Sequence, residues 1–182
     1  MEALTLLLKR QSCHALQEPG PDDAALQKIL RAALRVPDFL RLRPYQFLIA
    51  QGEGRDRLGA LMQQAAIASA RAAADIERAA KMPRRAPLVI VVVAKARESD
   101  TVSLFEQRLT AGCAVMAMQM AAVALGFAGV WRSGWPMFDA HLARKLGLCE
   151  QDRIVGFLYI GTAARAPNGP PDAAPDDFVR YL

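Results

Sequence analysis

Residues 106–134, EQRLTAGCAVMAMQMAAVALGFAGVWRSG, decide the fold of this chain. Between Ala111 and Trp131 the only polar side chain is Gln119, so the helical part of this stretch is apolar on every side. A helix of that kind belongs either in a membrane or in the middle of a packed domain. Its many Ala and Gly residues make it only mildly apolar, which favours the packed domain.

We therefore predict a buried central helix over residues 103–125, ended by Gly126 and followed by a strand over residues 127–132. Small residues along this helix let other backbones approach closely; they are Ala111, Gly112, Ala114, Ala117, Ala121 and Ala122. The pattern suits the middle of a bundle or a subunit interface. The strand leads into Arg132 and Ser133, which place a cation and a hydroxyl at its end.

Helices and strands alternate along the rest of the chain. The run LVIVVVA at residues 88–94 is typical of a strand buried on both faces. Apolar spacing predicts further strands over residues 45–50 and 154–160, and helices over residues 2–9, 55–80 and 138–146 and between Asp22 and Pro37. The chain is therefore interpreted as a single α+β domain, residues 1–182, with a central mixed sheet.

The last part of the chain, residues 163–182, has a different composition. It is rich in Pro, Ala and Asp and ends in the apolar sequence FVRYL. We predict an extended C-terminal tail that docks on its own subunit or on a neighbour.

Composition narrows the class of protein. A hydrophobic content of 53% argues against disorder, and 182 residues suffice for a substantial core. The net charge of +5 permits a phosphorylated ligand, whereas the scattered arginines argue against a nucleic-acid-binding face. Three widely spaced cysteines without a CxxC motif, and two isolated histidines, argue against a metal site or a disulfide framework. The N-terminus does not resemble a signal peptide, so we expect a cytoplasmic protein without a membrane segment.

The usual catalytic motifs are missing, so an enzyme with this sequence would need a cofactor to carry its reaction. Three short segments that follow regular elements stand out instead: Arg10-Gln11-Ser12, Arg35 and Arg132-Ser133-Gly134. Arginine forks, hydroxyls and free amides bind a phosphate dianion well. The alternative is that these arginines are ordinary surface residues at helix ends.

Five segments match one known pattern: RQS at residues 10–12, ILRAALRVPD at 29–38 with PYQF at 44–47, EQ at 106–107 with AGCAVMAMQMAA at 111–122, GFAGVWRSG at 126–134, and IVGFLYIGT at 154–162. Together they resemble the nitroreductase family, in particular its minimal bacterial branch of NAD(P)H nitroreductases. The resemblance implies a nitroreductase-like fold and an intertwined homodimer, with two FMN sites at the subunit interface. It also implies ping-pong hydride transfer from NADH or NADPH, through the flavin, to a small acceptor such as a nitroaromatic or a quinone.

The resemblance also implies which residues bind the cofactors. FMN contacts fall on Arg10, Gln11, Ser12, Trp131, Arg132 and Ser133, and, from the partner chain, on Arg35 and Phe39. The nicotinamide nucleotide would meet Ala121, Ala122, Val123, Ala124, Leu125 and Gly126. No side chain is expected to act as a catalytic acid or base, because the flavin carries the hydride.

Two departures from the family pattern fall on this site. Gln11 replaces the usual second arginine, and loss of a charge-assisted contact of about 1.5–3 kcal/mol would weaken FMN binding roughly ten- to hundredfold. Phe39, Leu40 and Arg41 replace a small or polar segment. Phe39 could stack on the flavin, or Phe39 and Leu40 could fill its pocket. The second case predicts a flavin-poor or flavin-free binding or regulatory protein.

Overall fold

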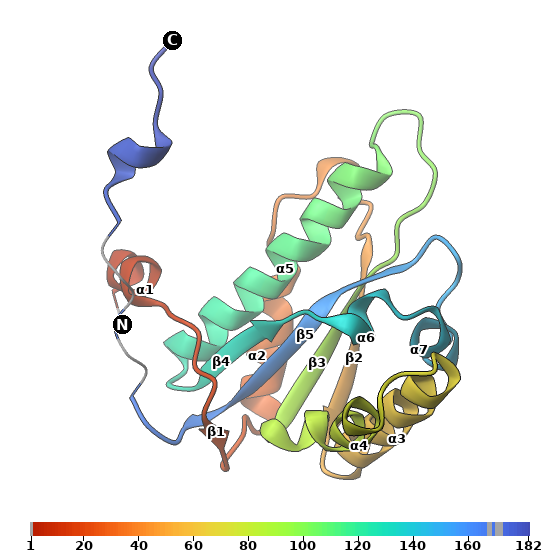
Figure 1. Cartoon of the computed structure of the whole chain (residues 1–182). Coiled ribbons are helices and arrows are strands. Elements are labelled where there is room, and N and C mark those ends of the chain that lie inside the picture. The colour runs from red at the N-terminus through yellow and green to blue at the C-terminus, as the bar shows by residue number, and fades with distance from the viewer. Residues whose placement is uncertain (1, 167–168, 170–172) are drawn as a thin grey trace.

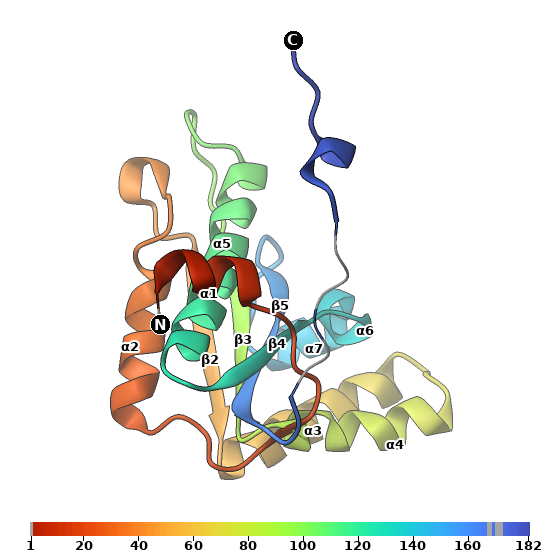
Figure 2. The ribbon, with the colours of Figure 1, turned by 90° about the vertical axis from the view of Figure 1, so that its left-hand side faces the viewer.

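The computed structural model describes residues 2–166, 169 and 173–182. A central sheet separates two groups of helices, with α2 and α5 on one face and α3, α4 and α7 on the other (Figures 1 and 2). The helices are α1 (Ala3–Lys9), α2 (Asp23–Ala33), α3 (Glu53–Ala68), α4 (Ala73–Lys81), α5 (Leu104–Ala124), α6 (Trp135–Phe138) and α7 (Ala140–Lys145). The strands are β1 (Leu16–Gln17), β2 (Tyr45–Gln51), β3 (Leu88–Ala94), β4 (Ala128–Arg132) and β5 (Arg153–Ala163), and the 3-10 turns are η1 (Phe39–Arg41), η2 (Met82–Arg85) and η3 (Pro175–Phe178).

The sheet has the order β1-β5-β3-β2, and β4 pairs with β5 on the side away from β3. The α+β prediction is confirmed, but the expectation of a mixed sheet is wrong, since every pairing between described strands is antiparallel. Two connections explain this. Helices α3 and α4 join β2 to β3. Because this connection has two helices instead of one, the chain re-enters the sheet from the opposite end, and β3 runs antiparallel to β2. The single helix α5 joins β3 to β4, which run in the same direction, but β5 lies between them.

The apolar run of β3 serves both faces of the sheet, as the sequence predicted. Leu88, Ile90 and Val92 pack with α2 and α5, and the alternating residues Val89, Val91 and Val93 pack with α3, α4 and α7. All seven residues of β3 are buried. The alternation follows from the twofold side-chain period of a strand, so one strand anchors two hydrophobic cores.

Helix α5 packs across the sheet, and its two ends and its contact with β4 are fixed by hydrogen bonds. A capping box fixes its start, because Ser103 and Glu106 satisfy each other's backbone amides. Gly126, with a φ of 90°, ends it and allows the amide of Phe127 to reach the carbonyl of Ala122 at 2.9 Å. The buried amide of Gln119 donates to the carbonyl of Gly129 at 3.0 Å, which ties the helix to β4.

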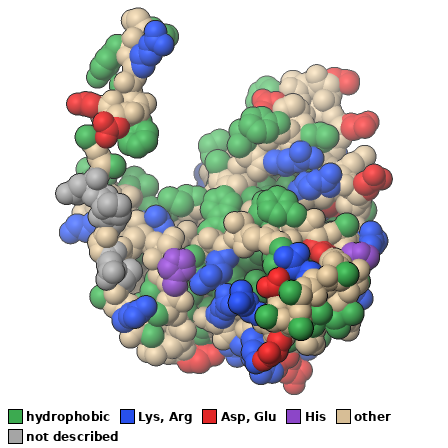
Figure 3. Space-filling view, in the orientation of Figure 1, with side chains coloured by type: hydrophobic (Ala, Val, Ile, Leu, Met, Phe, Trp, Pro, Cys, Tyr) green, Lys and Arg blue, Asp and Glu red, His purple; other side chains and the backbone are tan. Residues whose placement is uncertain are grey.

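Within one chain, α5 is buried on one side only, so the expectation of burial on every side needs correction. Phe105, Leu109 and Met116 lie on its outer face and are 67%, 52% and 39% exposed. Figure 3 shows hydrophobic side chains gathered along this helix. The physical reason is that the sheet and α2 cover one side of the helix and α1 contacts only part of the rest, which leaves these three side chains uncovered within the described part of the chain.

Two predicted helices have different bounds in the structure. The predicted helix over residues 55–80 turns back between α3 and α4, where Ala70 has a φ of 49°. Gly59 permits this close return, since a Cβ there would collide with the carbonyl oxygen of Ala80. The predicted helix over residues 138–146 is α7, preceded by the short α6, and Asp139 caps it.

Residues 173–182 of the tail are exposed, including Phe178 at 82% and Tyr181 at 90%. Figure 1 shows η3 lying away from the sheet. Docking of this tail stays a prediction, and part of the predicted segment, residues 167–168 and 170–172, lies outside the described residues.

Candidate functional site

The structure places the segment that follows α1, residues 10–14, beside β4, at the edge of that strand that faces away from β5. After α1 the chain runs beside that strand, and the amide of Cys13 donates to the carbonyl of Gly129 at 3.0 Å. A little further on, Ala164 donates to the carbonyl of Ala15 at 2.9 Å. These contacts fix residues 10–14 next to β4, although more than a hundred residues separate them in the sequence.

Arg132 connects the two segments through its side chain. Its Nη2 lies 3.2 Å from Nδ1 of His14, and its guanidinium carbon lies 5.6 Å from the centre of the Tyr159 ring. Its Nε is buried and has no hydrogen-bond partner among the described residues. Burial raises the pKa of Tyr159, and the positive charges of Arg85 and Arg132 oppose that shift. Arg132 is therefore half-buried and held in place, with hydrogen-bonding capacity left over.

The charges of this edge favour an anion. Neither Arg10 nor Arg132 takes part in a salt bridge in the part of the chain that the structure describes. Ser12 and Ser133 are exposed. The N-caps of α1 and α6 are Glu2 and Gly134, so neither serine caps these helices. Two such cations and two exposed hydroxyls form the kind of donor set that binds phosphate.

The side chain of Trp131 packs between α5 and β5. Its indole Nε1 donates to the carbonyl of Val155 at 3.3 Å. The ring packs against Gly112 of α5 on one side and Gly156 of β5 on the other, where a Cβ would collide with the indole. Trp131 therefore fixes the end of β4 against α5 and β5, and positions the backbone that leads into Arg132 and Ser133.

Arg35 and Phe39 lie on the other side of α5. The loop that carries them is tied to this helix by Thr110, whose hydroxyl donates to the carbonyl of Pro37 at 3.2 Å. Trp131 meets the same helix at Gly112, two residues on, which is about 200° around the helix axis. Within one chain, α5 therefore separates Arg35 and Phe39 from the Arg10 and Arg132 segments.

The conformation of this loop pushes Phe39 and Leu40 outward. Leu40, Arg41 and Arg43 all have positive φ, at 61°, 53° and 48°. The carboxylate of Asp38 holds the loop by accepting from the amides of Leu42 and Arg43 at 3.1 and 2.8 Å. Phe39 is 64% exposed and Leu40 56% exposed. These two side chains do not fill a pocket in their own chain.

Residues 121–126 form the last turn of α5 and its cap. The amides of Leu125, Gly126 and Phe127 are all used in that cap. A helix C-terminus presents carbonyl oxygens, which attract cations and repel phosphates. The predicted nicotinamide-nucleotide contact at these residues stays a prediction, and this turn offers no free backbone donor for a phosphate.

Sequence reasoning missed His14. It lies two residues after Ser12 on the same segment, and its ring contacts Arg132. Because His14 follows the RQS sequence so closely, it could have been predicted as part of the site.

Comparisons with known proteins agree with this fold. The model of the family described as "Nitroreductase family" matches residues 7–162. The chain is 48% identical over 185 residues to "Putative NAD(P)H nitroreductase YdjA" of Escherichia coli strain K12, and both chains are covered completely. It is 38% identical over 184 residues to "Putative NAD(P)H nitroreductase" of Haemophilus influenzae, again over the full length of both.

Solved structures share the fold at lower identity. The nitroreductase-like family protein from Bacillus cereus superposes with a TM-score of 0.85 at 20% identity, with 100% of this chain and 96% of the other covered. A point mutant of the FMN and NADPH-dependent nitroreductase NfnB from sphigopyxis sp. strain HMH gives a TM-score of 0.74 at 20% identity, with 100% and 99% covered.

A three-layer α+β fold crossed by one long helix, with two Arg/Ser segments joined at a sheet edge, defines the class. The chain belongs to the nitroreductase family, which places it among the oxidoreductases. None of the described helices is both long enough and apolar enough to span a membrane.

Proposed function

We propose that the protein is an FMN-dependent NAD(P)H oxidoreductase of the nitroreductase type. The observation that carries this proposal is the joining of residues 10–14 to β4, which brings the segment of Arg10 and Ser12 to the strand that ends in Arg132 and leads into Ser133. Neither arginine forms a salt bridge among the described residues. These residues suit the phosphate of FMN, and the buried Nε of Arg132, which has no hydrogen-bond partner in the described part of the chain, is a donor that a phosphate could satisfy. The names of its relatives, which include NAD(P)H, and of NfnB, which includes FMN, support the same choice.

Each residue would have a distinct task. Arg10 and Arg132 would bind the phosphate by charge, Ser12 and Ser133 would donate their hydroxyls, and Trp131 would hold the strand end in place. FMN, when bound, supplies two-electron chemistry that takes hydride from NADH or NADPH and passes it, in ping-pong order, to a nitroaromatic, a quinone or a similar acceptor. The chain itself then needs no acid or base of unusual pKa, in keeping with a site built from arginines and serines.

The proposed enzyme is a homodimer. Leu4, Leu7 and Leu8 of α1 are 59%, 61% and 71% exposed, and α1 lies against α5, whose outer face is also apolar. A second copy that covered this surface would explain why so many large apolar side chains face water. It would also let Arg35 and Phe39 reach the Arg10 and Arg132 segments of the partner chain, which they cannot do within their own chain.

The absorbance spectrum of the purified protein tests this function. We expect the two bands of bound oxidised flavin, in the near ultraviolet and the blue, to persist after added FMN is removed by desalting. NADH or NADPH should bleach them in the absence of oxygen, and the mass in solution should be that of two chains. A colourless protein that does not retain FMN would overturn the proposal.

One variant separates the enzyme from the alternative of a flavin-poor binding protein. Because Phe39 does not occupy its own chain's site, we expect Phe39→Ala to leave FMN retention unchanged or to lower it. If instead the wild type is colourless and Phe39→Ala retains FMN, the partner's Phe39 blocks the flavin pocket. That result would favour a binding or regulatory function over an enzyme.

A further inference from the structure

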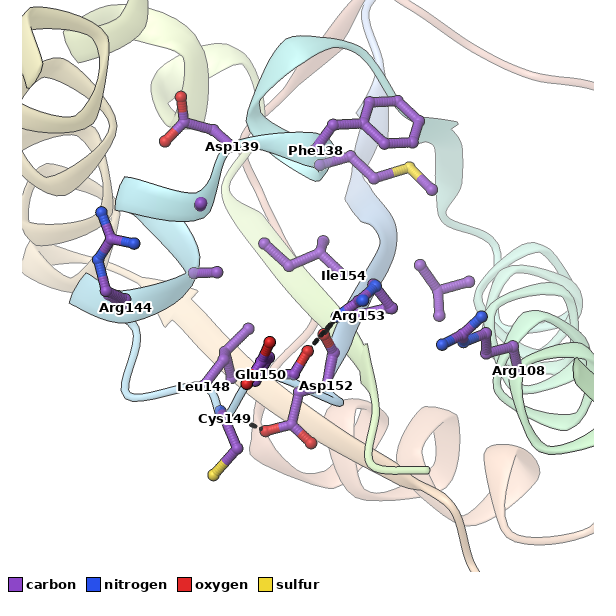
Figure 4. A pocket seen from close by; sticks show the side chains of 14 residues that line it. Arg108, Phe138, Asp139, Arg144, Leu148, Cys149, Glu150, Asp152, Arg153 and Ile154 are labelled. Atoms are coloured by element: carbon purple, nitrogen blue, oxygen red, sulfur yellow. Dashed lines mark hydrogen bonds between the residues drawn. The ribbon is translucent and has the colours of Figure 1, made fainter. Parts of the chain in front are cut away.

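A cavity of about 900 Å³ lies between the first half of α5, the α6–α7 segment and the start of β5 (Figure 4). None of the residues predicted to bind FMN or a nicotinamide nucleotide lines it. It exists because β4 ends at Arg132, opposite Phe157, so the first residues of β5 have no strand beside them on that edge. Its volume is that of a small-molecule site.

The wall of the cavity is mostly apolar. Phe138, Leu148, Ile154 and Val155 face it, and Phe138 is 77% exposed at its mouth. Leu148 and Ile154 are already buried, so a flat apolar or aromatic body of modest size would gain mainly by removing Phe138 and Val155 from water, at roughly 25 cal/mol per Å² of apolar surface.

Two arginines extend into this space from opposite walls, Arg108 from α5 and Arg153 from β5 (Figure 4). Arg153 Nη1 donates to the backbone carbonyls of Glu150 and Asp152, which holds its guanidinium in place. Nε of Arg108 is buried and lacks a hydrogen-bond partner within the described residues. Neither arginine forms a salt bridge within that part of the chain.

The acidic residues of the cavity do not neutralise these cations. Asp139 accepts from the hydroxyl of Ser69 and caps α7 through the amide of Leu142. Asp152 is buried, paired with Lys95, and accepts from the amide of Cys149. Glu150 is exposed, and Arg144, a third arginine of the lining, contacts His141. Arg108 is half-buried and Arg153 exposed, and neither is paired with a carboxylate in the described part of the chain, so both guanidinium groups can still donate to an anion in this largely apolar space.

We propose that this cavity binds a small organic carboxylate with an aromatic or similarly flat apolar body. The carboxylate lies between Arg108 and Arg153, where planar guanidinium groups can donate in pairs to its two oxygens. The apolar body lies on Phe138, Leu148, Ile154 and Val155. A free phosphate would satisfy the arginines but leave the apolar wall uncovered, so both parts of the cavity favour the carboxylate.

Benzoate is the probe, with benzamide as its uncharged counterpart and inorganic phosphate as a bare anion. Binding is measured by calorimetry on the full chain as purified. We expect benzoate to bind with a dissociation constant in the millimolar range or below, and benzamide and phosphate to bind roughly ten- to hundredfold more weakly. Arg108→Gln should weaken the binding of benzoate by a similar factor, whereas Arg108→Lys should retain part of the affinity for benzoate.

Two control variants make the test specific. Arg57→Gln removes an exposed arginine elsewhere on the surface, and Arg132→Gln alters the proposed flavin site; both should bind benzoate as the wild type does. The proposal is overturned if benzoate and benzamide bind equally, or if Arg132→Gln abolishes binding while Arg108→Gln does not. It is also overturned if benzoate does not bind and a structure of the dimer shows the partner chain filling the cavity. Thermal melting of each variant shows that a loss of binding is not a loss of fold.

Discussion

Nη2 of Arg132 lies 3.2 Å from Nδ1 of His14, and this contact joins two segments that are 118 residues apart in the chain. The first segment carries Arg10 and Ser12, and the second carries Ser133. A site assembled in this way depends on the tertiary fold, so substitutions at either segment should affect the same ligand.

Arg132→Gln should weaken FMN binding roughly ten- to hundredfold, because it removes a charge-assisted contact from a half-buried position. Fluorescence titration of the apoprotein with FMN measures the change. Arg57→Gln, at an exposed arginine paired with Glu53, is the matched control and should have no effect. Equal affinities for the two variants would show that Arg132 does not contact the cofactor.

Gln11→Arg should tighten FMN binding about tenfold, since it restores a positive charge next to Arg10 and Ser12. Gln27→Arg adds the same charge on an exposed position of α2 and controls for a general electrostatic effect. Raising the salt concentration should reduce the gain from Gln11→Arg, because salt screens charges at partly exposed sites. A gain of the same size from Gln27→Arg would contradict a local role for position 11.

Gly156→Ala should lower the free energy of unfolding by about 1–3 kcal/mol, because the new methyl group would collide with the indole of Trp131. Urea denaturation measures the loss. Gly54→Ala is the control, since a Cβ there meets its nearest neighbour at an ordinary 3.7 Å. If Gly156→Ala is as stable as Gly54→Ala, Trp131 does not hold β4 against β5 as described.

Tyr159 should make the fold sensitive to alkali. Burial raises its pKa in the folded state above the unfolded value of about 10, so its contribution is fully present below that pH and is lost as the pH rises through the folded-state pKa. Tyr159→Phe keeps the ring beside Arg132 but cannot ionise. The stability difference between wild type and Tyr159→Phe should therefore change above about pH 10 and stay constant below it. Parallel pH profiles would contradict this.

Local sequence patterns predicted much of the architecture. The run of β3 has the bounds expected of it, and α5 differs by one residue at each end, because continuous apolar runs and caps are strong local signals. The antiparallel sheet was not predictable in the same way. It depends on β5 entering between β3 and β4, and pairing between distant segments leaves no mark on the local pattern.

The candidate site also has a part that the local sequence predicts and a part that only the tertiary fold creates. Arg10, Ser12, Arg132 and Ser133 stood out because a cation and a hydroxyl follow a regular element, which is a local signal. The contact of His14 with Arg132, and the position of Arg108 and Arg153 on the walls of one cavity, arise only from packing. Sequence could not show that Phe39 and Leu40 point away from their own chain, because that direction comes from three positive φ angles in one loop.

The position of β5 has a consequence for how the chain is made. This strand lies at residues 153–163 and supplies one side of the pairing for β1, β3 and β4, so among the pairings of the described strands only β2–β3 can form without it. During synthesis on the ribosome, most of the sheet must therefore wait for the last of the described strands to emerge. Contacts between distant segments slow folding, and apolar strands that stay unpaired can misfold or aggregate. A nascent chain halted before residue 153 would expose the apolar edge of β3, and it is at this stage that a chaperone would matter most to the yield of folded protein.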